Sequence, residues 1–286
     1  MSIVITGATG QLGRLVIADL LAAGVPADGI TAVARSKEKA ADLAAQGVKV
    51  AIADYDEPAT LDEIFSAGDR VLLVSGTDFG RRVGQHAAVI DATKKAGVSQ
   101  LAYTSVFGAP DNAMLLAADH KATEQLILDS GVPHTLLRNN WYSEMGVFDL
   151  PATVESGAIV NGVSPDGRLA TASRQDFAAA ASAVLRTDGH LNQAYELSGD
   201  GAWTFGEYAA EVTRQTGKPV VHRSLSHDEN LAGLTAAGIP EAFATVLADV
   251  DTQISTGTLS GTPGTLAQLI GRPTTPIATT IADQLG

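Results

Sequence analysis

Residues 3–14 read Ile3-Val-Ile-Thr-Gly7-Ala-Thr-Gly10-Gln-Leu-Gly13-Arg14, and this stretch decides the fold class. A short apolar run that predicts a buried strand comes first, and an amphipathic stretch that predicts a helix follows. The three glycines between them have the spacing G-x-x-G-x-x-G. Gly7 permits a tight turn, Gly10 lets the backbone approach a pyrophosphate, and Gly13 lets the helix pack closely on the strand. The pattern therefore predicts a site for the phosphates of a dinucleotide.

The start of the predicted helix adds to this prediction. Its first N–H groups and the positive end of its dipole favour bound phosphate. Thr9, Gln11 and Leu12 lie in the same loop and are expected to line the cofactor together with the glycines. A glycine-rich turn without a ligand is the alternative. The position of the loop, after a strand and at the start of a βα series, favours the dinucleotide.

The rest of the first half alternates apolar runs with helical patterns. This alternation predicts a doubly wound Rossmann α/β fold, in which helices cover both faces of a parallel sheet. Strands are predicted at 2–6, 30–34, 48–53, 70–75, 99–104 and 132–137, and helices at 11–23, 36–46, from 58, at 82–96 and at 118–130.

After Arg138 the rhythm changes to short elements rich in glycine and proline. A helix from the N-cap Asp176 to Arg186 and a strand at 194–197 are predicted, and Thr204 with Glu207 forms a capping box for a further helix. We expect residues 1–138, with returning segments near 174–198, to form an NADP-binding domain. Residues 139–173 and 199–286 are expected to form a smaller, mostly helical lobe on the substrate side.

Composition excludes several classes of function. The 286 residues contain no cysteine, which excludes disulfides, thiol catalysis and thiolate metal sites. The net charge of −13 disfavours binding to DNA or RNA. The six histidines show no metal-ligand spacing, so no metal is expected. We see neither a signal peptide nor a membrane span, and the cytoplasm is the expected location.

The residues after the second predicted strand indicate which dinucleotide is bound. An NAD site needs a carboxylate there for the ribose 2′-hydroxyl, and none is present. Arg35 is suited to a 2′-phosphate, and Lys37 would strengthen the positive field. The alternative is that Arg35 is solvated at the start of a helix. The pattern favours NADP(H).

Further polar and small residues follow the later strands, where ligands bind in open α/β sheets. Any one of them alone would be ordinary turn chemistry. Asp54 and Tyr55 are expected to contact adenine. Ser75 and Gly76 are expected near the pyrophosphate and its ribose, and Thr104 and Ser105 near the nicotinamide ribose.

The usual catalytic pair of short-chain reductases, Tyr-x-x-x-Lys, is absent from the helix after the fifth strand. If Glu124 takes the place of the acid that often follows the lysine, then Leu116 occupies the tyrosine position and His120 the lysine position. His120 is a candidate for binding the nicotinamide ribose or for relaying a proton, because its pKa is ordinarily near neutral. A structural, hydrogen-bonded histidine is the equal alternative.

The end of the sixth strand supplies the remaining candidates. Asn139 or Asn140 is placed to reach the nicotinamide carboxamide, and Trp141 and Tyr142 are candidates for a stacking wall, or else for a plug between the lobes. Loop residues near this edge suggest an apolar pocket; they are Phe79, Phe107, Met114, Met145 and Phe148.

These motifs resemble the NmrA-like atypical short-chain dehydrogenase/reductase family, close to NADPH-dependent quinone oxidoreductases and triphenylmethane reductases. The resemblance runs nearly end to end and rests on residues 5–13, 53–55, 102–105, 136–139 and 141–144. It implies direct hydride transfer from NADPH to a quinone or a similar electron-poor acceptor, with His120, Asn139 and Tyr142 on the nicotinamide side.

Two alternatives stay open. One is a non-catalytic NADP(H) sensor that acts through protein partners. The other is a reductase of triarylmethane dyes, imines or carbonyls. The expected partner is a small aromatic or quinone-like molecule, and a homodimer is left open.

Overall fold

A parallel sheet forms the centre of the protein in the computed structural model, which describes residues 2–78, 80–146 and 150–285. Within these residues seven strands run parallel to one another. In order across the sheet they are β3 (Lys49–Ile52), β2 (Ile30–Ala34), β1 (Ile3–Ile5), β4 (Arg70–Leu73), β5 (Gln100–Val106), β6 (His134–Asn139) and β9 (Gln193–Leu197). The order reverses direction at β1, as the doubly wound prediction requires.

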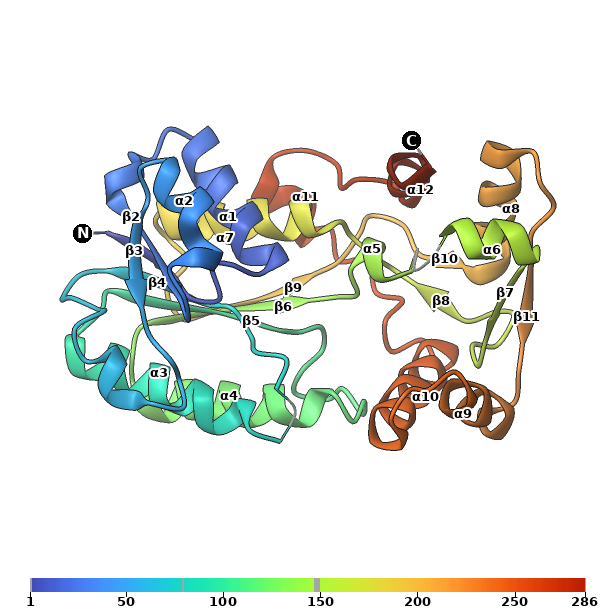
Figure 1. The fold of residues 1–286 in the computed structure, drawn as a ribbon, viewed down its shortest axis with the longest axis horizontal. Helices are drawn as coiled ribbons and strands as arrows, with labels where there is room; N and C mark the ends of the chain where they lie inside the picture. The colour runs from blue at the N-terminus through green and yellow to red at the C-terminus, as the bar shows by residue number, and fades with distance from the viewer. Residues whose placement is uncertain (1, 79, 147–149, 286) are drawn as a thin grey trace.

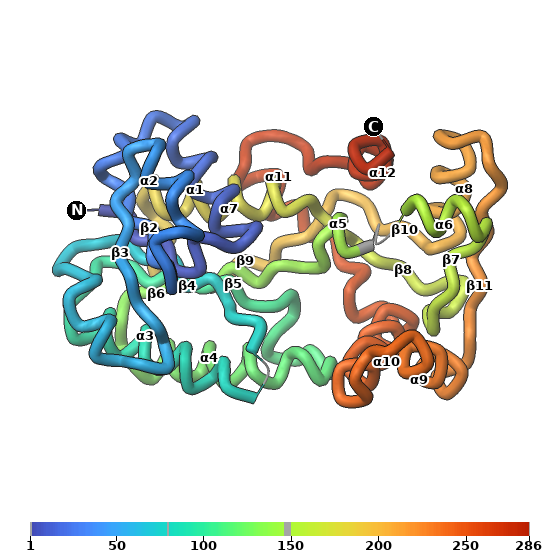
Figure 2. Tube along the Cα trace, in the orientation of Figure 1, coloured from blue at the N-terminus to red at the C-terminus, as the bar shows by residue number. Residues whose placement is uncertain are grey.

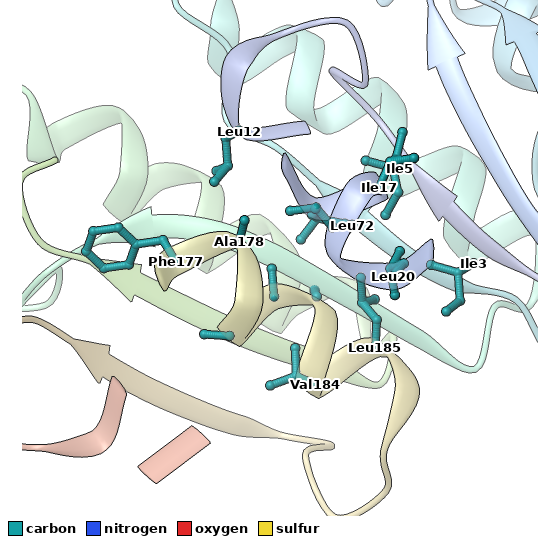
Figure 3. Packing of buried hydrophobic residues seen from close by; sticks show 14 of the residues in the cluster. Ile3, Ile5, Leu12, Ile17, Leu20, Leu72, Phe177, Ala178, Val184 and Leu185 are labelled. Atoms are coloured by element: carbon teal, nitrogen blue, oxygen red, sulfur yellow. The ribbon is translucent and has the colours of Figure 1, made fainter. Parts of the chain in front are cut away.

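Both faces of the sheet are covered by helices (Figure 1). One face carries α1 (Gln11–Ala22), α7 (Arg174–Arg186) and α11 (Thr265–Ile270), and the other carries α3 (Arg82–Ala96) and α4 (Ala117–Ser130). Strand residues alternate between the two cores: Ile3 and Ile5 pack with α1 and α7, whereas Val4 packs on the opposite side. Figure 3 shows the packing of α7 against the first of these cores.

The smaller lobe lies beyond the carboxyl ends of the strands, at the other end of the molecule from the amino terminus (Figure 2). It contains two two-stranded sheets, which pair β7 (Ala158–Asn161) with β11 (Val221–Ser224), and β8 (Arg168–Leu169) with β10 (Trp203–Thr204). Its helices are α5 (Ser143–Gly146), α6 (Leu150–Ser156), α8 (Phe205–Thr216), α9 (His227–Ala236), α10 (Glu241–Ser255) and α12 (Ile277–Leu285).

Several predicted elements differ from those observed. The helix predicted at 36–46 is a 3-10 turn (Glu38–Ala40) followed by the short α2 (Ala41–Ala45), and only a 3-10 turn (Pro58–Leu61) follows β3. A third 3-10 turn (Ala27–Gly29) precedes β2. The four short strands of the lobe were not predicted, because two to four residues are too few for a recognisable alternation.

The boundaries around α7 and α11 also need correction. Ser173, not Asp176, is the N-cap of α7, because its hydroxyl accepts the backbone N–H of Asp176. Leu266 on α11 belongs to the core formed with α1 and α7, although residues 199–286 were assigned to the substrate lobe. The capping box of Thr204 and Glu207 is present as predicted. None of the helices among the described residues combines the length and apolarity that crossing a bilayer requires.

Candidate active site

One cavity of about 900 Å³ lies where the carboxyl ends of the sheet strands meet the smaller lobe. Loops after β1, β2, β3, β4, β5 and β6 contribute to its wall, and so does α10 of the lobe. Residues from distant parts of the chain therefore share one site, as expected for the switch point of a doubly wound sheet.

The glycine-rich loop forms one end of the cavity. All six predicted loop residues line it: Gly7, Thr9, Gly10, Gln11, Leu12 and Gly13. Gly7 has a φ of +58°, which favours glycine. Within the described residues no side chain caps α1, and its first turn contains no acidic residue. The first N–H groups of α1 thus remain available to an anion.

A positive charge lies on the cavity wall just after β2. Arg35 follows β2, lines the cavity and is exposed, and it forms no ion pair with any residue that the structure describes. Lys39 also lines the cavity, whereas Lys37 does not. Lys37 was the second cation predicted beside Arg35, and this prediction is wrong: Lys39 takes that place, because the 3-10 turn at 38–40 brings it round to the cavity.

The later strand ends line the cavity with one exception. Asp54, Tyr55, Ser75, Gly76 and Ser105 all lie on its wall. Thr104 does not: its side chain is buried behind the wall. Its hydroxyl accepts the backbone N–H of Ser75 at 2.8 Å, so it holds the ends of β4 and β5 together. Alternation explains this, since neighbouring strand residues point to opposite sides.

Two of these residues form hydrogen bonds with groups near the cavity. Burial raises the pKa of the Tyr55 phenol, and its hydrogen bonding to the Thr6 side chain and the Gly7 backbone acts in the opposite direction. Tyr55 therefore supports the turn at Gly7. The Ser105 hydroxyl donates to the buried Glu124, which also pairs with Arg138 at 2.7 Å. Glu124 is accordingly a structural anchor for the end of β5.

His120 lies on the cavity wall and is only 6% exposed. Its Nδ1 lies 2.9 Å from the hydroxyl oxygen of Tyr103. Burial, together with the nearby Arg82 and His86, lowers the pKa of His120 to about 3. The imidazole is therefore neutral near pH 7, so His120 is available as a hydrogen-bonding group but not as a cationic acid.

Arg82 is a wall residue that the sequence reasoning missed. It is buried, donates to Asp119 at 2.8 Å and to the Leu116 carbonyl at 2.9 Å, and so connects α3 with the start of α4. Little in the sequence indicated that Arg82 would be a buried residue of the cavity wall, because an arginine at the start of a helix is usually solvated. Only its ion pair with Asp119 on α4, and its own burial, reveal this role.

Asn139 and Tyr142 face each other at the end of β6. Burial raises the pKa of the Tyr142 phenol, and hydrogen bonding with the Asn139 side chain opposes this effect. The Oδ1 of Asn139 is buried on the cavity wall without a partner among the described residues. An unpaired buried acceptor is costly, so a ligand that donates a hydrogen bond here would be stabilised.

The neighbours of this pair differ in their availability. The side chain of Asn140 is committed, because its amide donates to the Ser198 hydroxyl and the Leu259 carbonyl and its oxygen accepts the Trp141 backbone N–H. Tyr142 packs edge-on against Phe177, and the Arg174 guanidinium lies 4.8 Å from the centre of its ring. Arg174 also lines the cavity.

Apolar side chains line part of the cavity wall. α10 contributes Phe243, Val246, Leu247 and Val250, and Leu116, Trp141, Met145 and Leu259 complete this surface. The sequence reasoning missed the α10 residues. Their i, i+3, i+4, i+7 spacing is the usual signal of a buried helix face, and it does not show what that face will contact.

The expected loop residues are only partly at this site. Met145 lines the cavity, but Phe107 and Met114 belong to the core of the smaller lobe. Phe79 and Phe148 lie outside the described residues. Trp141 and Tyr142 both lie on the cavity wall. Neither side chain is therefore only a plug between the lobes.

The residues of this cavity fit a bound NADPH. The uncapped helix start accommodates a pyrophosphate, Arg35 and Lys39 accommodate a 2′-phosphate, and the orphaned Asn139 oxygen accommodates an amide donor. An apolar surface for a second molecule adjoins them. The arrangement is suited to reactions between a dinucleotide and a flat apolar compound.

Comparisons with known proteins agree with this geometry. Residues 7–188 match a family described as NAD(P)H-binding. The chain is 45% identical over 280 residues to quinone oxidoreductase 2 of Escherichia coli strain K12, an alignment that covers 98% of this chain and 97% of the relative.

Solved structures are also similar over the whole length. A crystal structure of the E. coli NADPH-dependent quinone oxidoreductase with NADPH has a TM-score of 0.96 at 44% identity, covering 99% of this chain and 100% of that one. A Citrobacter sp. triphenylmethane reductase complexed with NADP(H) has a TM-score of 0.93 at 41% identity, covering 99% of each chain.

Proposed function

Because this chain belongs to the NAD(P)H-binding family, we propose that it is an NADPH-dependent reductase that transfers a hydride directly to quinones or similar electron-poor conjugated acceptors. One observation carries the proposal: a single cavity joins the phosphate loop and Arg35 to an apolar surface formed by α10 and the end of β6. The near full-length similarity to quinone oxidoreductase 2 supports the same activity.

The residues of the site divide this work between them. The residues that would hold the cofactor are those of the loop 7–13, with Arg35, Lys39, Asp54, Tyr55, Ser75, Gly76 and Ser105. NADPH, when bound, supplies a hydride with its electron pair; with one proton from water, the hydride converts a quinone to a hydroquinone and leaves NADP⁺. His120, Asn139 and Tyr142 would orient the reacting groups, and the apolar wall would exclude water.

Quinone reduction suits a site that lacks the Tyr-x-x-x-Lys pair. A ketone needs an acid beside its oxygen as the hydride arrives, whereas the product of quinone reduction is stabilised by its aromatic ring. Leu116 and the neutral His120 occupy the relevant positions and line the cavity. Hydrogen bonds without proton transfer are sufficient there.

A second candidate activity is the reduction of triarylmethane dyes. The observation that favours it is the similarity to the Citrobacter triphenylmethane reductase over the full length of the chain. The apolar wall would contact the aromatic rings of such a dye as readily as those of a quinone. For the cell, we propose a cytoplasmic location, which subcellular fractionation tests.

The experiment that tests the proposal is NADPH oxidation followed at 340 nm with 1,4-benzoquinone. Parallel assays contain NADH, a triarylmethane dye, or no protein. Protein-dependent oxidation with a strong preference for NADPH is the expected result. If the protein binds NADPH but neither a quinone nor a dye consumes it, the proposed activity is wrong and the non-catalytic sensor takes its place.

A further inference from the structure

A buried tyrosine lies directly behind His120. Tyr103 is on β5, and its side chain is fully buried. Its hydroxyl oxygen is 2.9 Å from Nδ1 of His120. Burial raises the pKa of this phenol, so its proton is retained. Neither the cofactor loop nor the apolar wall includes Tyr103, and its role is therefore separate from both.

Neighbouring hydrogen bonds determine the direction of this bond. The backbone N–H of Gly76 donates to Nε2 of His86 at 3.0 Å. The neutral His86 must then carry its proton on Nδ1, which donates to the Thr123 hydroxyl oxygen at 2.9 Å. The Thr123 hydroxyl in turn donates to the Asp119 carbonyl at 2.8 Å. The position of every proton in this series of hydrogen bonds is thereby assigned.

Two groups lie within reach of the Tyr103 hydroxyl among the described residues: Nδ1 of His120, at 2.9 Å, and the hydroxyl of Thr123. The Thr123 oxygen already accepts from His86, and its proton goes to Asp119, so Nδ1 of His120 is the acceptor still available to Tyr103. A buried O–H without an acceptor is costly, so the phenol donates and Nδ1 accepts. A neutral imidazole that accepts at Nδ1 carries its proton on Nε2. His120 lines the cavity, and none of the described residues forms a hydrogen bond with its Nε2.

We infer that Tyr103 is a positioning residue that holds His120 in the Nε2–H tautomer, so that this N–H is offered as a hydrogen-bond donor to the acceptor oxygen that gains negative charge. The inference rests on the proposed function for the identity of that oxygen. The tautomer itself follows from the hydrogen bonds and from the neutral state of the two histidines, and it does not depend on the identity of that oxygen.

The charges around His120 keep it in this neutral form. Arg82 on α3 lies close to it, and Asp119, on the same helix as His120, is already paired with Arg82. His86 on α3 is likewise buried, and burial and Arg82 lower its pKa to about 4. A protonated His120 would thus be a second buried cation beside Arg82. His120 accordingly stabilises developing charge as a donor, and the proton of the product comes from water.

Nitrogen NMR of histidine-labelled protein tests the tautomer without turnover. The His120 resonance is identified by its loss in His120→Gln. In the wild-type protein at pH 7, this resonance should show a protonated Nε2 and an accepting Nδ1. In Tyr103→Phe this resonance should move toward a mixture of both tautomers. Tyr195→Phe is the matched control, because Tyr195 forms the same kind of bond, 2.8 Å to Nδ1 of His190, away from the cavity. A protonated Nδ1 on His120 in the wild-type protein would overturn the inference.

Kinetics test the role of the donor. Tyr103→Phe should lower kcat for the quinone about tenfold and leave the Kd for NADPH unchanged. His120→Gln, which retains an N–H donor, should keep more of kcat than His120→Leu. The wild-type kcat should be flat from roughly pH 5 to pH 9, because neither buried histidine titrates there.

The outcomes separate the two proposals. A wild-type kcat in Tyr103→Phe, measured on protein with a normal melting temperature, contradicts the positioning role. Equal losses in His120→Gln and His120→Leu also contradict it. A protein that shows the expected tautomer but reduces no quinone contradicts the proposed function and leaves the tautomer assignment in place.

Discussion

Gly10, the N-cap of α1, and Gly13, in its first turn, are glycines for different reasons. A Cβ at Gly13 would come within 2.5 Å of the Gly7 carbonyl oxygen and 2.8 Å of the Ala8 Cα. A Cβ at Gly10 would meet only the same carbonyl, at 3.3 Å, and its φ of −78° suits any residue. Packing therefore requires Gly13, whereas Gly10 leaves room for a ligand.

We predict that Gly13→Ala lowers the free energy of unfolding by about 1–3 kcal/mol, because the clash is with backbone atoms. Gly10→Ala should unfold at nearly the wild-type urea concentration but bind NADPH about tenfold more weakly, since the new methyl group faces the phosphates. Urea unfolding and a fluorescence titration with NADPH measure the two effects. Equal losses of stability in both variants would contradict the distinction.

We expect the cofactor preference to depend mainly on Arg35. Arg35 is exposed, lines the cavity and has no ion-pair partner in the described part of the chain. Arg35→Asp should raise the KM for NADPH by roughly 10- to 100-fold and narrow the gap to NADH, because a charge-assisted hydrogen bond is replaced by repulsion.

Lys37→Asp is the matched control for Arg35→Asp. Lys37 is also exposed and lies two residues away, but it does not line the cavity. Its KM for NADPH should stay within about twofold of the wild-type value. An unchanged preference for NADPH in Arg35→Asp would remove Arg35 from the cofactor site.

At the scale of the elements, α10 is expected to determine which acceptors enter. Its apolar stripe lines the cavity, and Val246 lies in the middle of that stripe. Val246→Asp should raise the KM for a hydrophobic quinone at least about tenfold, because a charge would have to be buried beside the ring. The Kd for NADPH should not change, since the phosphate loop and Arg35 belong to the sheet domain and not to α10.

Ala242→Asp provides the control on the same helix. Ala242 is exposed and does not line the cavity, so this variant adds the same charge to α10 without touching the acceptor. The steady-state KM values of the two variants for one quinone make the comparison. If both variants raise KM equally, the effect is a general one of charge, and the role of the stripe is disproved.

The elements also show where sequence reasoning succeeded. The helix at 82–96 was predicted with its observed bounds, because periodic apolar residues end at Gly97, which has a φ of +70°. In the structure, the helix predicted at 36–46 is a short 3-10 turn followed by the short helix α2. Arg14 on α1 contacts both, by a bond to the Lys39 carbonyl and an ion pair with Asp42, and this tertiary contact is invisible in a local pattern.

At the scale of the whole molecule, two buried histidines make stability depend on pH. The folded protein lowers the pKa of His86 to about 4 and of His120 to about 3, mainly through burial, against about 6.5 in an unfolded chain. Below about pH 6.5 the unfolded chain therefore binds more protons than the folded protein. The free energy of unfolding should fall by about 1.4 kcal/mol per pH unit for each histidine as pH decreases from 6 toward 4.

Urea unfolding at a series of pH values tests this linkage. In His86→Gln the decline between pH 6 and pH 4 should be shallower than in the wild-type protein, because one of the two groups no longer titrates. His227→Gln, at an exposed position, should keep the wild-type slope. A wild-type slope in His86→Gln would mean that burial of His86 does not contribute to acid unfolding.

What the sequence alone determined is local in origin. The glycine loop, the alternation of strands and helices, and Arg35 in place of an acid together established the parallel sheet and the family of its cofactor. These signals depend on neighbours within a few residues, on backbone conformation and on a charge at a known strand end. The candidates Asn139 and Tyr142 followed from the same rule about strand ends, and their catalytic roles stay predictions.

Only the tertiary structure decided which side chains meet in the cavity and in what protonation state. It placed Thr104 behind the wall and put Lys39 rather than Lys37 at the cavity. It also made α10, more than 100 residues from His120 in the sequence, line the same cavity as His120. It also placed Tyr103 under His120. The physical reason is that burial, pairing and proton positions depend on contacts between segments far apart in the chain, and no local pattern encodes them.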